Sequence, residues 1–354
     1  MRPALSRLEV SPSVPGRRLL SLLITYLVLA GGCTKNPPPT QEKIRVGYFP
    51  NITHSQALVG MARGDFRRAL GPGVSMDSTI FNAGPSVIEA MFAGRIDLAY
   101  IGPNPAVNGY IQSQGKALRI VAGATSGGAA FVVRTGSGIH GPADLTGKKF
   151  ATPQLGNTQD VALRDYLKVH GLTTSDKGGN VEIFPTPNPD IYDLFVQGRI
   201  DGAWVPEPWA SRLVLDGKGE VLVDERQLWP SGDFVTAQVI VRTEFLVQHP
   251  DLVYRWLKAH VEITQWEENH PDEALPLLNA QMEKLTGKKL SAQVLDQAWR
   301  NLRPTWDPFP GTLQRSAEAA YAAGFLSERP NLEGIYALEA LNQVLREKGL
   351  PEVH

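Results

Sequence analysis

The stretches FNAGPSVIEAMFAGRIDLAYIGPNP (81–105) and FPTPNPDIYDLFVQGRIDGAWVPEP (184–208) follow one plan. Each begins with a turn, continues with apolar residues at helical spacing, and reaches Gly-Arg-Ile-Asp, after which a short apolar strand follows. A glycine that ends a helix before a buried strand is common, so one copy of this tetrapeptide would mean little. Two copies in the same local order predict a repeated structural unit.

The repeat extends on the N-terminal side of both stretches. Apolar strands around Tyr48 and Ala151 are each followed by a predicted helix and by a second strand. The spacing agrees, because Tyr48 to Ile80 and Ala151 to Ile183 are both 32 residues apart. We therefore predict two α/β units of similar topology, which bind ligands at the carboxyl ends of their strands. The charges of Gly-Arg-Ile-Asp lie at the opposite strand ends and are interpreted as structural.

The second half of the chain is predicted to be mostly helical. After a strand at 234–241, helices are predicted at 251–268, 272–284, 291–300, 313–323 and 332–348. We therefore expect lobe I to contain residues 43–124 and 229–354, and lobe II to contain residues 125–228. A chain that crosses twice between two lobes favours a hinge between them.

The N-terminus has the features of an export signal. Two arginines precede the uncharged run 19–32 (LLSLLITYLVLAGG), which is short for a membrane-spanning helix and typical of a signal peptide. Cys33 follows directly, and residues 33–42 are interpreted as a Pro-rich tether. The pattern resembles a bacterial lipoprotein signal. That resemblance implies removal of residues 1–32, lipidation of Cys33, and anchoring to a bacterial membrane on its periplasmic or extracytoplasmic side.

The composition argues against several classes of protein. The 354 residues carry 35 Lys and Arg against 36 Asp and Glu, so the basic surface that nucleic-acid binding normally needs is not indicated. Cys33 is the single cysteine, which excludes an internal disulfide and a cysteine-based metal cluster. The seven histidines show no zinc-binding spacing. We therefore expect neither a metal nor a cofactor.

Five longer stretches carry a resemblance to a known family. They are 44–66 (IRVGYFPNITHSQALVGMARGDF), 81–107 (FNAGPSVIEAMFAGRIDLAYIGPNPAV), 143–167 (ADLTGKKFATPQLGNTQDVALRDYL), 201–213 (DGAWVPEPWASRL) and 249–266 (HPDLVYRWLKAHVEITQW). Over residues 43–350 the chain resembles the solute-binding lipoproteins of ABC importers for sulfonates, taurine and nitrate. The resemblance implies an α/β, type II periplasmic-binding-protein fold, in which two lobes and C-terminal helices enclose a solute. It also implies an ABC permease and its ATPase as partners, and no catalysis.

The strand-end loops of both units are the predicted ligand contacts. Several of them begin helices, whose free N–H groups and partial positive charge bind anions. Because these loops contain no Lys or Arg, a compact monoanion fits better than a polyanion held by arginines. Ordinary helix capping is the alternative explanation for any single Ser, Thr or Asn. The predicted ligand-binding residues are Asn51, Thr53, His54, Asn82, Gly84, Pro103, Asn104, Ser126, Gly127, Gly156, Asn157, Thr158, Glu207 and Trp209.

Glu207 and Trp209 distinguish between solutes. A carboxylate between two prolines at a strand end predicts a partner for a ligand ammonium group, and Trp209 predicts an apolar or cation–π wall. The solute would then be a zwitterion such as taurine, or a thiamine-pyrimidine-like heterocycle. The alternative is a solvent-exposed Glu207 beside a Trp209 that belongs to the core.

Two other classes of protein remain open. One is a membrane-anchored enzyme of the same fold, although the chain shows no nucleophile elbow, no Ser-His-Asp order and no Gly-rich phosphate loop. The other is the ectodomain of a sensor. The favoured prediction is the extracytoplasmic solute-binding component of an ABC importer, acting as a monomer.

Overall fold

The computed structural model describes residues 42–354. The predicted signal peptide 1–32, Cys33 and the tether up to residue 41 lie outside the described residues. Among the helices of the described part, none has the length and apolar character needed to cross a membrane.

The first sheet has six strands. They are β1 (Glu42–Tyr48), β2 (Val74–Ile80), β3 (Leu98–Ile101), β4 (Leu118–Gly127), β10 (Val235–Arg242) and β11 (Leu302–Pro304). Their order in the sheet is β11-β4-β10-β3-β1-β2. β1 pairs in parallel with β2 and β3, whereas β10 is antiparallel to β3 and β4.

The second sheet has five strands and repeats this arrangement. They are β5 (Ala129–Arg134), β6 (Lys149–Thr152), β7 (Glu182–Pro185), β8 (Gly202–Pro206) and β9 (Gly219–Asp224), in the order β7-β6-β8-β5-β9. β6 pairs in parallel with β7 and β8, and β5 is antiparallel to β8 and β9. The parallel trio β7-β6-β8 therefore corresponds to β2-β1-β3, which confirms the repeat predicted from the sequence.

The two Gly-Arg-Ile-Asp segments join strands of each trio through their aspartates. Asp97 is fully buried, and its carboxylate accepts hydrogen bonds from the backbone N of Arg45 (2.9 Å) and from Nη2 of Arg242 (2.9 Å). Asp201, its counterpart, accepts one from the backbone N of Lys149 (2.9 Å). Each aspartate thus ties the start of β3 or β8 to its parallel neighbour, which agrees with the structural interpretation of these charges.

Thirteen helices surround the sheets in the described part. They are α1 (Ser55–Arg63), α2 (Asp65–Leu70), α3 (Gly84–Phe92), α4 (Pro103–Gln112), α5 (Thr158–Val169), α6 (Asn188–Val196), α7 (Trp209–Leu215), α8 (Thr243–Gln248), α9 (Pro250–Asn269), α10 (Pro271–Thr286), α11 (Ala292–Arg300), α12 (Pro310–Ala323) and α13 (Glu339–Glu347). One face of the first sheet packs against α1, α9, α10, α11 and α13, and the other against α3, α4 and α12. For the second sheet, α5 covers one face, and α6 and α7 cover the other.

The predicted helix 332–348 is wrong in its first half, because the helix begins only at Glu339. Gly334 has a positive φ of 77°, which ends any helical path there. The segment then runs beside β4, where Ile120 N donates to Ile335 O (2.8 Å) and Ala337 N donates to Ile120 O (2.9 Å). The apolar spacing of this segment suits a helix, but the segment is extended and pairs with β4.

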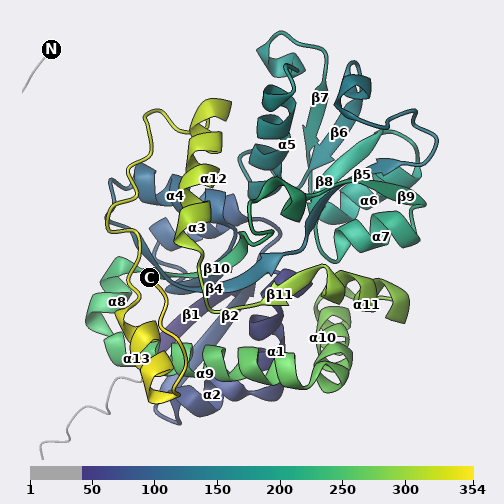
Figure 1. The fold of residues 1–354 in the computed structure, drawn as a ribbon. Helices are drawn as coiled ribbons and strands as arrows, with labels where there is room; N and C mark the ends of the chain where they lie inside the picture. Colours follow the sequence, from purple (N-terminus) through teal and green to yellow (C-terminus); the bar gives the residue numbers. More distant parts are fainter. Residues whose placement is uncertain (1–41) are drawn as a thin grey trace, which may run out of the picture. The chain divides into compact units, whose positions relative to one another are not determined.

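The chain passes between the sheets at two places. It leaves the first sheet through Gly128, between β4 and β5, and returns through the 3-10 helix Glu225–Leu228 and residues 229–234. Helices near the C-terminus also connect the two halves, since α12 packs against α5 and α11 packs against α7. Figure 1 shows α12 extending from the region of the first sheet toward α5. The carboxyl ends of both parallel trios are thereby held close together.

Candidate functional site

An inner cavity lies where the carboxyl ends of the two parallel trios meet. From the first sheet and its loops it is lined by Phe49, Asn51, Thr53, His54, Asn82, Ala83, Gly102 and Thr236; from the second it is lined by Asn157, Thr158, Gln159, Asn188 and Pro206. Of the predicted contacts, Asn51, Thr53, His54, Asn82, Asn157 and Thr158 are brought together here. The cavity volume of about 20 Å³ is enough for about one water molecule, so the walls would have to move apart to admit a nitrate or sulfonate group.

Four helices begin at the inner cavity, two from each sheet. Ala83 and Gly102 immediately precede α3 and α4, Asn157 precedes α5, and Asn188 is the first residue of α6. Each helix end carries about half a positive charge, but prolines in the first turns of α3, α4 and α6 reduce the number of free N–H groups there. Two N–H groups are already used, because Thr158 N donates to the side chain of Asn157 (2.7 Å) and Asp190 N donates to Pro187 O (2.9 Å). The convergence of the four helix ends creates a field that attracts an anion.

Among the described residues, no Lys, Arg, Asp or Glu side chain lines the inner cavity. His54 does not supply a cation either, because burial lowers its pKa to about 3 and the ring is neutral at physiological pH. Its Nδ1 accepts a hydrogen bond from Phe49 N (3.3 Å), which leaves the proton on Nε2. Asp160 in the first turn of α5 is paired with Arg164 (3.2 Å), which offsets its charge. The positive potential of the cavity therefore comes from the helix ends.

Two buried polar atoms at the inner cavity have no hydrogen-bond partner within residues 42–354. They are Oγ1 of Thr158 and Oδ1 of Asn188, whose side chains are 6% and 5% exposed. A buried polar atom without a partner costs about 1–3 kcal/mol, so such atoms normally have one. The Thr158 hydroxyl can donate a hydrogen bond to an oxyanion, whereas the Asn188 oxygen can only accept and needs a donor such as a water molecule.

Other predicted contacts lie beside the cavity rather than in its wall. Gly84 is buried against Pro105, and Ser126 donates to Asp233 (2.9 Å) at the end of β4. Gly127 adopts φ of 73° directly before the chain crosses to the second sheet, and Gly156 N donates to Asp160 (2.9 Å) in the loop before α5.

Pro103 and Asn104 begin α4, but the side chain of Asn104 turns toward α12. Its Nδ2 donates to Ser316 O (2.8 Å). It therefore lines a second cavity, described below, and not the inner cavity.

Glu207 differs from both interpretations of the sequence. It is 1% exposed, and its carboxylate accepts hydrogen bonds from Ser211 N (3.0 Å), Ser211 Oγ (2.9 Å) and Asn301 Nδ2 (2.7 Å). Protein groups thus occupy both oxygens, and burial raises the pKa of the carboxyl. In this structure Glu207 faces no ligand ammonium; it connects the start of α7 to the end of α11.

Trp209 lies at the entrance to the inner cavity and is partly buried. Its Nε1 donates to Asn51 Oδ1 (3.1 Å), which joins α7 to the loop after β1. The guanidinium of Arg212 stacks on its ring at 4.8 Å. The indole is thus a wall that connects elements of both sheets.

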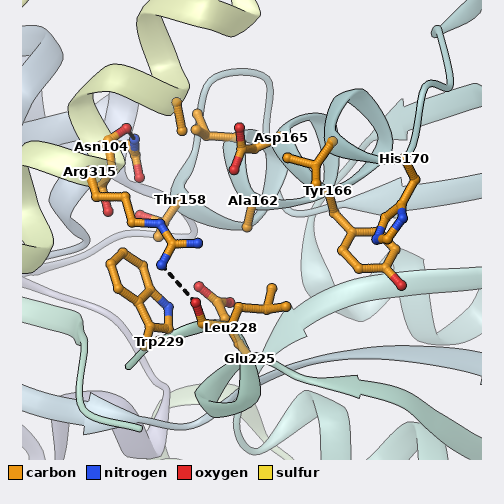
Figure 2. A pocket seen from close by; sticks show the side chains of 14 residues that line it. Asn104, Thr158, Ala162, Asp165, Tyr166, His170, Glu225, Leu228, Trp229 and Arg315 are labelled. Atoms are coloured by element: carbon orange, nitrogen blue, oxygen red, sulfur yellow. Dashed lines mark hydrogen bonds between the residues drawn. The ribbon is translucent and has the colours of Figure 1, made fainter. Parts of the chain in front are cut away.

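A side cavity lies between α5, α12 and the 3-10 helix at 225–228 (Figure 2). Arg315 stacks over Trp229 at 4.5 Å and donates to Leu228 O (2.7 Å). Thr158 is the one described residue that lines both this and the inner cavity. Asp165 and Glu225 also line it, and burial raises the pKa of Glu225 to about 7. With two carboxyl groups against the single guanidinium of Arg315, the side cavity is less suited to an anion than the inner cavity.

Two polar residues of the inner cavity, Asn188 and Thr236, were not predicted from the sequence, whereas Gln159 lies in a predicted contact loop. Asn188 had a usable signal, because the offset of 104 residues that relates Gly94 to Gly198 also relates Gly84 to Asn188. Thr236 lies on the return strand β10, and no pattern in the sequence indicated that it lines the cavity. No group of three or more His, Cys, Asp or Glu side chains within residues 42–354 is placed to hold a metal ion.

A family model described as NMT1-like matches residues 37–276. The chain belongs to the NMT1-like family. The taurine-binding periplasmic protein of Escherichia coli K12 is 30% identical over 212 residues, which cover 60% of this chain and 63% of that protein. A Bacillus subtilis 168 protein named for the binding of aliphatic sulfonates is 26% identical over 294 residues, which cover 80% and 82% of the two chains.

Solved structures of this NMT1-like protein's structural neighbours confirm the type II periplasmic-binding-protein fold. The alkanesulfonate-binding protein of Xanthomonas axonopodis pv. citri, bound to MOPS, superposes with a TM-score of 0.70 at 20% identity, covering 84% of this chain and 98% of that one. The nitrate-binding protein of Synechocystis PCC 6803 gives 0.71 at 14% identity, covering 89% and 91%. The enzyme DszB, solved with biphenyl-2-sulfinic acid, shares the fold as well, with a TM-score of 0.58 at 18% identity over 87% and 99% of the chains.

Proposed function

We propose that this chain is the extracytoplasmic solute-binding component of an ABC importer, and that it holds the anionic group of a small sulfonate, taurine-like or nitrate-like solute in the inner cavity. The observation that carries the proposal is the buried hydroxyl of Thr158, which has no partner among the described residues and lies at a point where four helices begin. The uncharged lining formed by the described side chains favours an oxyanion held by N–H, hydroxyl and amide groups.

The two sheets and their helices act, in this proposal, as two lobes. Because β4 of the first sheet runs to Gly127, lobe II begins at Gly128 and not at residue 125. Solute binding stabilises the closed arrangement to the extent that groups of both lobes contact the solute. Asn51 and Asn82 come from the first lobe, and Thr158 and Asn188 from the second. The closed, loaded protein then delivers its solute to an ABC permease, which works with its ATPase. The proposal includes no catalysis on the solute.

Replacement of Thr158 by Val tests the proposal at its central residue. Because the buried hydroxyl has no partner within residues 42–354, its removal should not lower the melting temperature in the absence of solute and should raise it if no water satisfies the hydroxyl in the parent. Loss of one hydrogen bond to a charged group should weaken binding of the anion about tenfold or more. Titration calorimetry of residues 34–354 with nitrate, ethanesulfonate, taurine and a thiamine-pyrimidine precursor measures both the solute class and the loss.

Thr173→Val is the matched control, since Thr173 is exposed and lies outside the cavity. The proposal is wrong if none of the four compounds binds to the parent protein. It is also wrong if the parent binds one of them and Thr158→Val binds it equally well.

We propose further that Cys33 carries a lipid anchor on the outer side of a bacterial membrane. The support is the position of this single cysteine after the run 19–32. In cells fed an alkyne fatty acid, we expect the parent chain to become labelled and to sediment with membranes, whereas Cys33→Ser should do neither. Equal labelling of the two chains would exclude this anchor.

A further inference from the structure

An outer groove runs beside the inner cavity along α7 and α10. Phe49, Asn51, Asn82 and Asn188 line both the groove and the cavity, so the two spaces lie next to each other. The groove has a volume of about 370 Å³, against about 20 Å³ for the inner cavity. The inner cavity is therefore too small for the organic part of a solute, which would have to lie in the groove.

The walls of the outer groove are mostly apolar. On one side are Met282, Leu285 and Leu290 from α10 and the residues after it, and opposite them is Trp209 at the start of α7. Ile80, at the end of β2, also lines it and is 36% exposed. An apolar surface of this kind gains free energy when an alkyl or aryl group covers it.

The charged side chains that the described part of the chain contributes to the outer groove are all cationic. Arg212 and Lys288 line it, and no Asp or Glu of that part does. The Arg212 guanidinium is held between Tyr192 (4.4 Å) and Trp209 (4.8 Å), with Asp216 at 3.8 Å. A solute with an ammonium group at its far end would place that group near two cations without a carboxylate partner in the groove wall.

We propose that the outer groove is a second subsite, which binds the apolar tail of an amphiphilic organic anion whose head occupies the inner cavity. This inference rests on the proposed function and names its solute class: an alkyl or aryl anion, with no amine at the end of the tail. Trp209, Met282 and Leu285 set the preference for the tail. Arg212 and Lys288 discriminate against a terminal ammonium and accept a terminal anion.

Binding of octanesulfonate and of ethanesulfonate, measured by titration calorimetry on residues 34–354, tests the tail subsite. Each methylene that is fully buried strengthens binding by about fourfold, so octanesulfonate should bind at least thirtyfold more tightly than ethanesulfonate. Leu285→Asn should weaken octanesulfonate about tenfold and leave ethanesulfonate unchanged. Leu277→Asn on the same helix is the matched control, because Leu277 is also partly buried but does not line the groove.

Charge reversal at Lys288 tests the preference at the end of the tail. An octanesulfonate with a terminal amine should bind the parent at least tenfold more weakly than octanesulfonate itself, and Lys288→Glu should reduce this difference several-fold. The neighbouring Lys289→Glu should not, since Lys289 is exposed and outside the groove. If the parent, Lys288→Glu and Lys289→Glu all prefer octanesulfonate over its terminal amine to the same degree, Lys288 does not discriminate against a terminal ammonium.

The outcomes separate the two proposals. If ethanesulfonate and octanesulfonate bind equally well and Leu285→Asn changes neither, the subsite is refuted while the inner anion site stands. If neither sulfonate binds, nor nitrate or taurine, both the site and the subsite are refuted.

Discussion

The variant Gly102→Val is expected to bind its anion at least a hundredfold more weakly than the parent chain while remaining folded. Gly102 precedes α4 with φ of −70° and ψ of 160°, a backbone conformation open to any residue. A Cβ at this position would lie 2.4 Å from Oγ1 of Thr158, which belongs to the second sheet's α5. The clash acts across the cleft, so the branched side chain of valine should hold the two halves apart without disturbing either core.

Two measurements on Gly102→Val distinguish failed closure from misfolding. Small-angle scattering should show that saturating anion compacts the parent but not the variant, while circular dichroism and the melting temperature stay close to the parent values. Gly141→Val is the matched control, because Gly141 is extended at φ of −172° and a Cβ added there would meet no described atom within 4 Å. Parent-like affinity in Gly102→Val would show that closure around Thr158 is not needed.

The variant Glu267→Gln is expected to be more stable than the parent chain by an amount that grows as the pH rises from about 5 to 8. Glu267 is fully buried, and burial raises its pKa from 4.5 to about 8. Below pH 4.5 the carboxyl is protonated in both the folded and unfolded chains, so its ionisation costs nothing. Between these two values the unfolded chain loses the proton first, and the folded state loses stability relative to it. The difference approaches about 4 kcal/mol near pH 8.

Urea denaturation at pH 5, 6.5 and 8 measures this effect of Glu267. Ser55 Oγ donates to the Glu267 carboxylate at 2.7 Å, and the amide oxygen in Glu267→Gln can accept the same hydrogen bond, so the variant should fold normally. Glu328→Gln, at an exposed position, should show no such trend with pH. A constant difference between Glu267→Gln and the parent at all three pH values would show that the carboxyl does not titrate in this range.

The repeated unit and the helix starts that follow the strand-end loops were predictable from the sequence because both are local properties. Gly-Arg-Ile-Asp recurs at a constant offset, and polar residues such as Asn51 and Thr158 occupy strand-end loops whatever the packing around them. Loops at the carboxyl ends of parallel strands converge by topology, so these two residues could be assigned to one cavity without coordinates.

Glu207 shows where such reasoning stops. Its position at a strand end was predictable, but its orientation depends on Asn301, which is 94 residues away along the chain. The position of Thr236 in the cavity wall also depends on distant segments, because its strand β10 runs antiparallel to β3 and β4. The segment before Glu339 pairs with β4 although its apolar spacing suits a helix.

The sequence alone determined the two α/β units, the export signal pattern and the lack of Lys and Arg in the strand-end loops, since each depends on residues that are neighbours in the chain. Only the tertiary structure decided which polar groups of residues 42–354 are left without partners, which carboxylates are already paired, and where the outer groove lies relative to the inner cavity. Those features depend on contacts between α7, α10 and the strand ends, and side-chain packing between distant segments is not encoded in any local pattern.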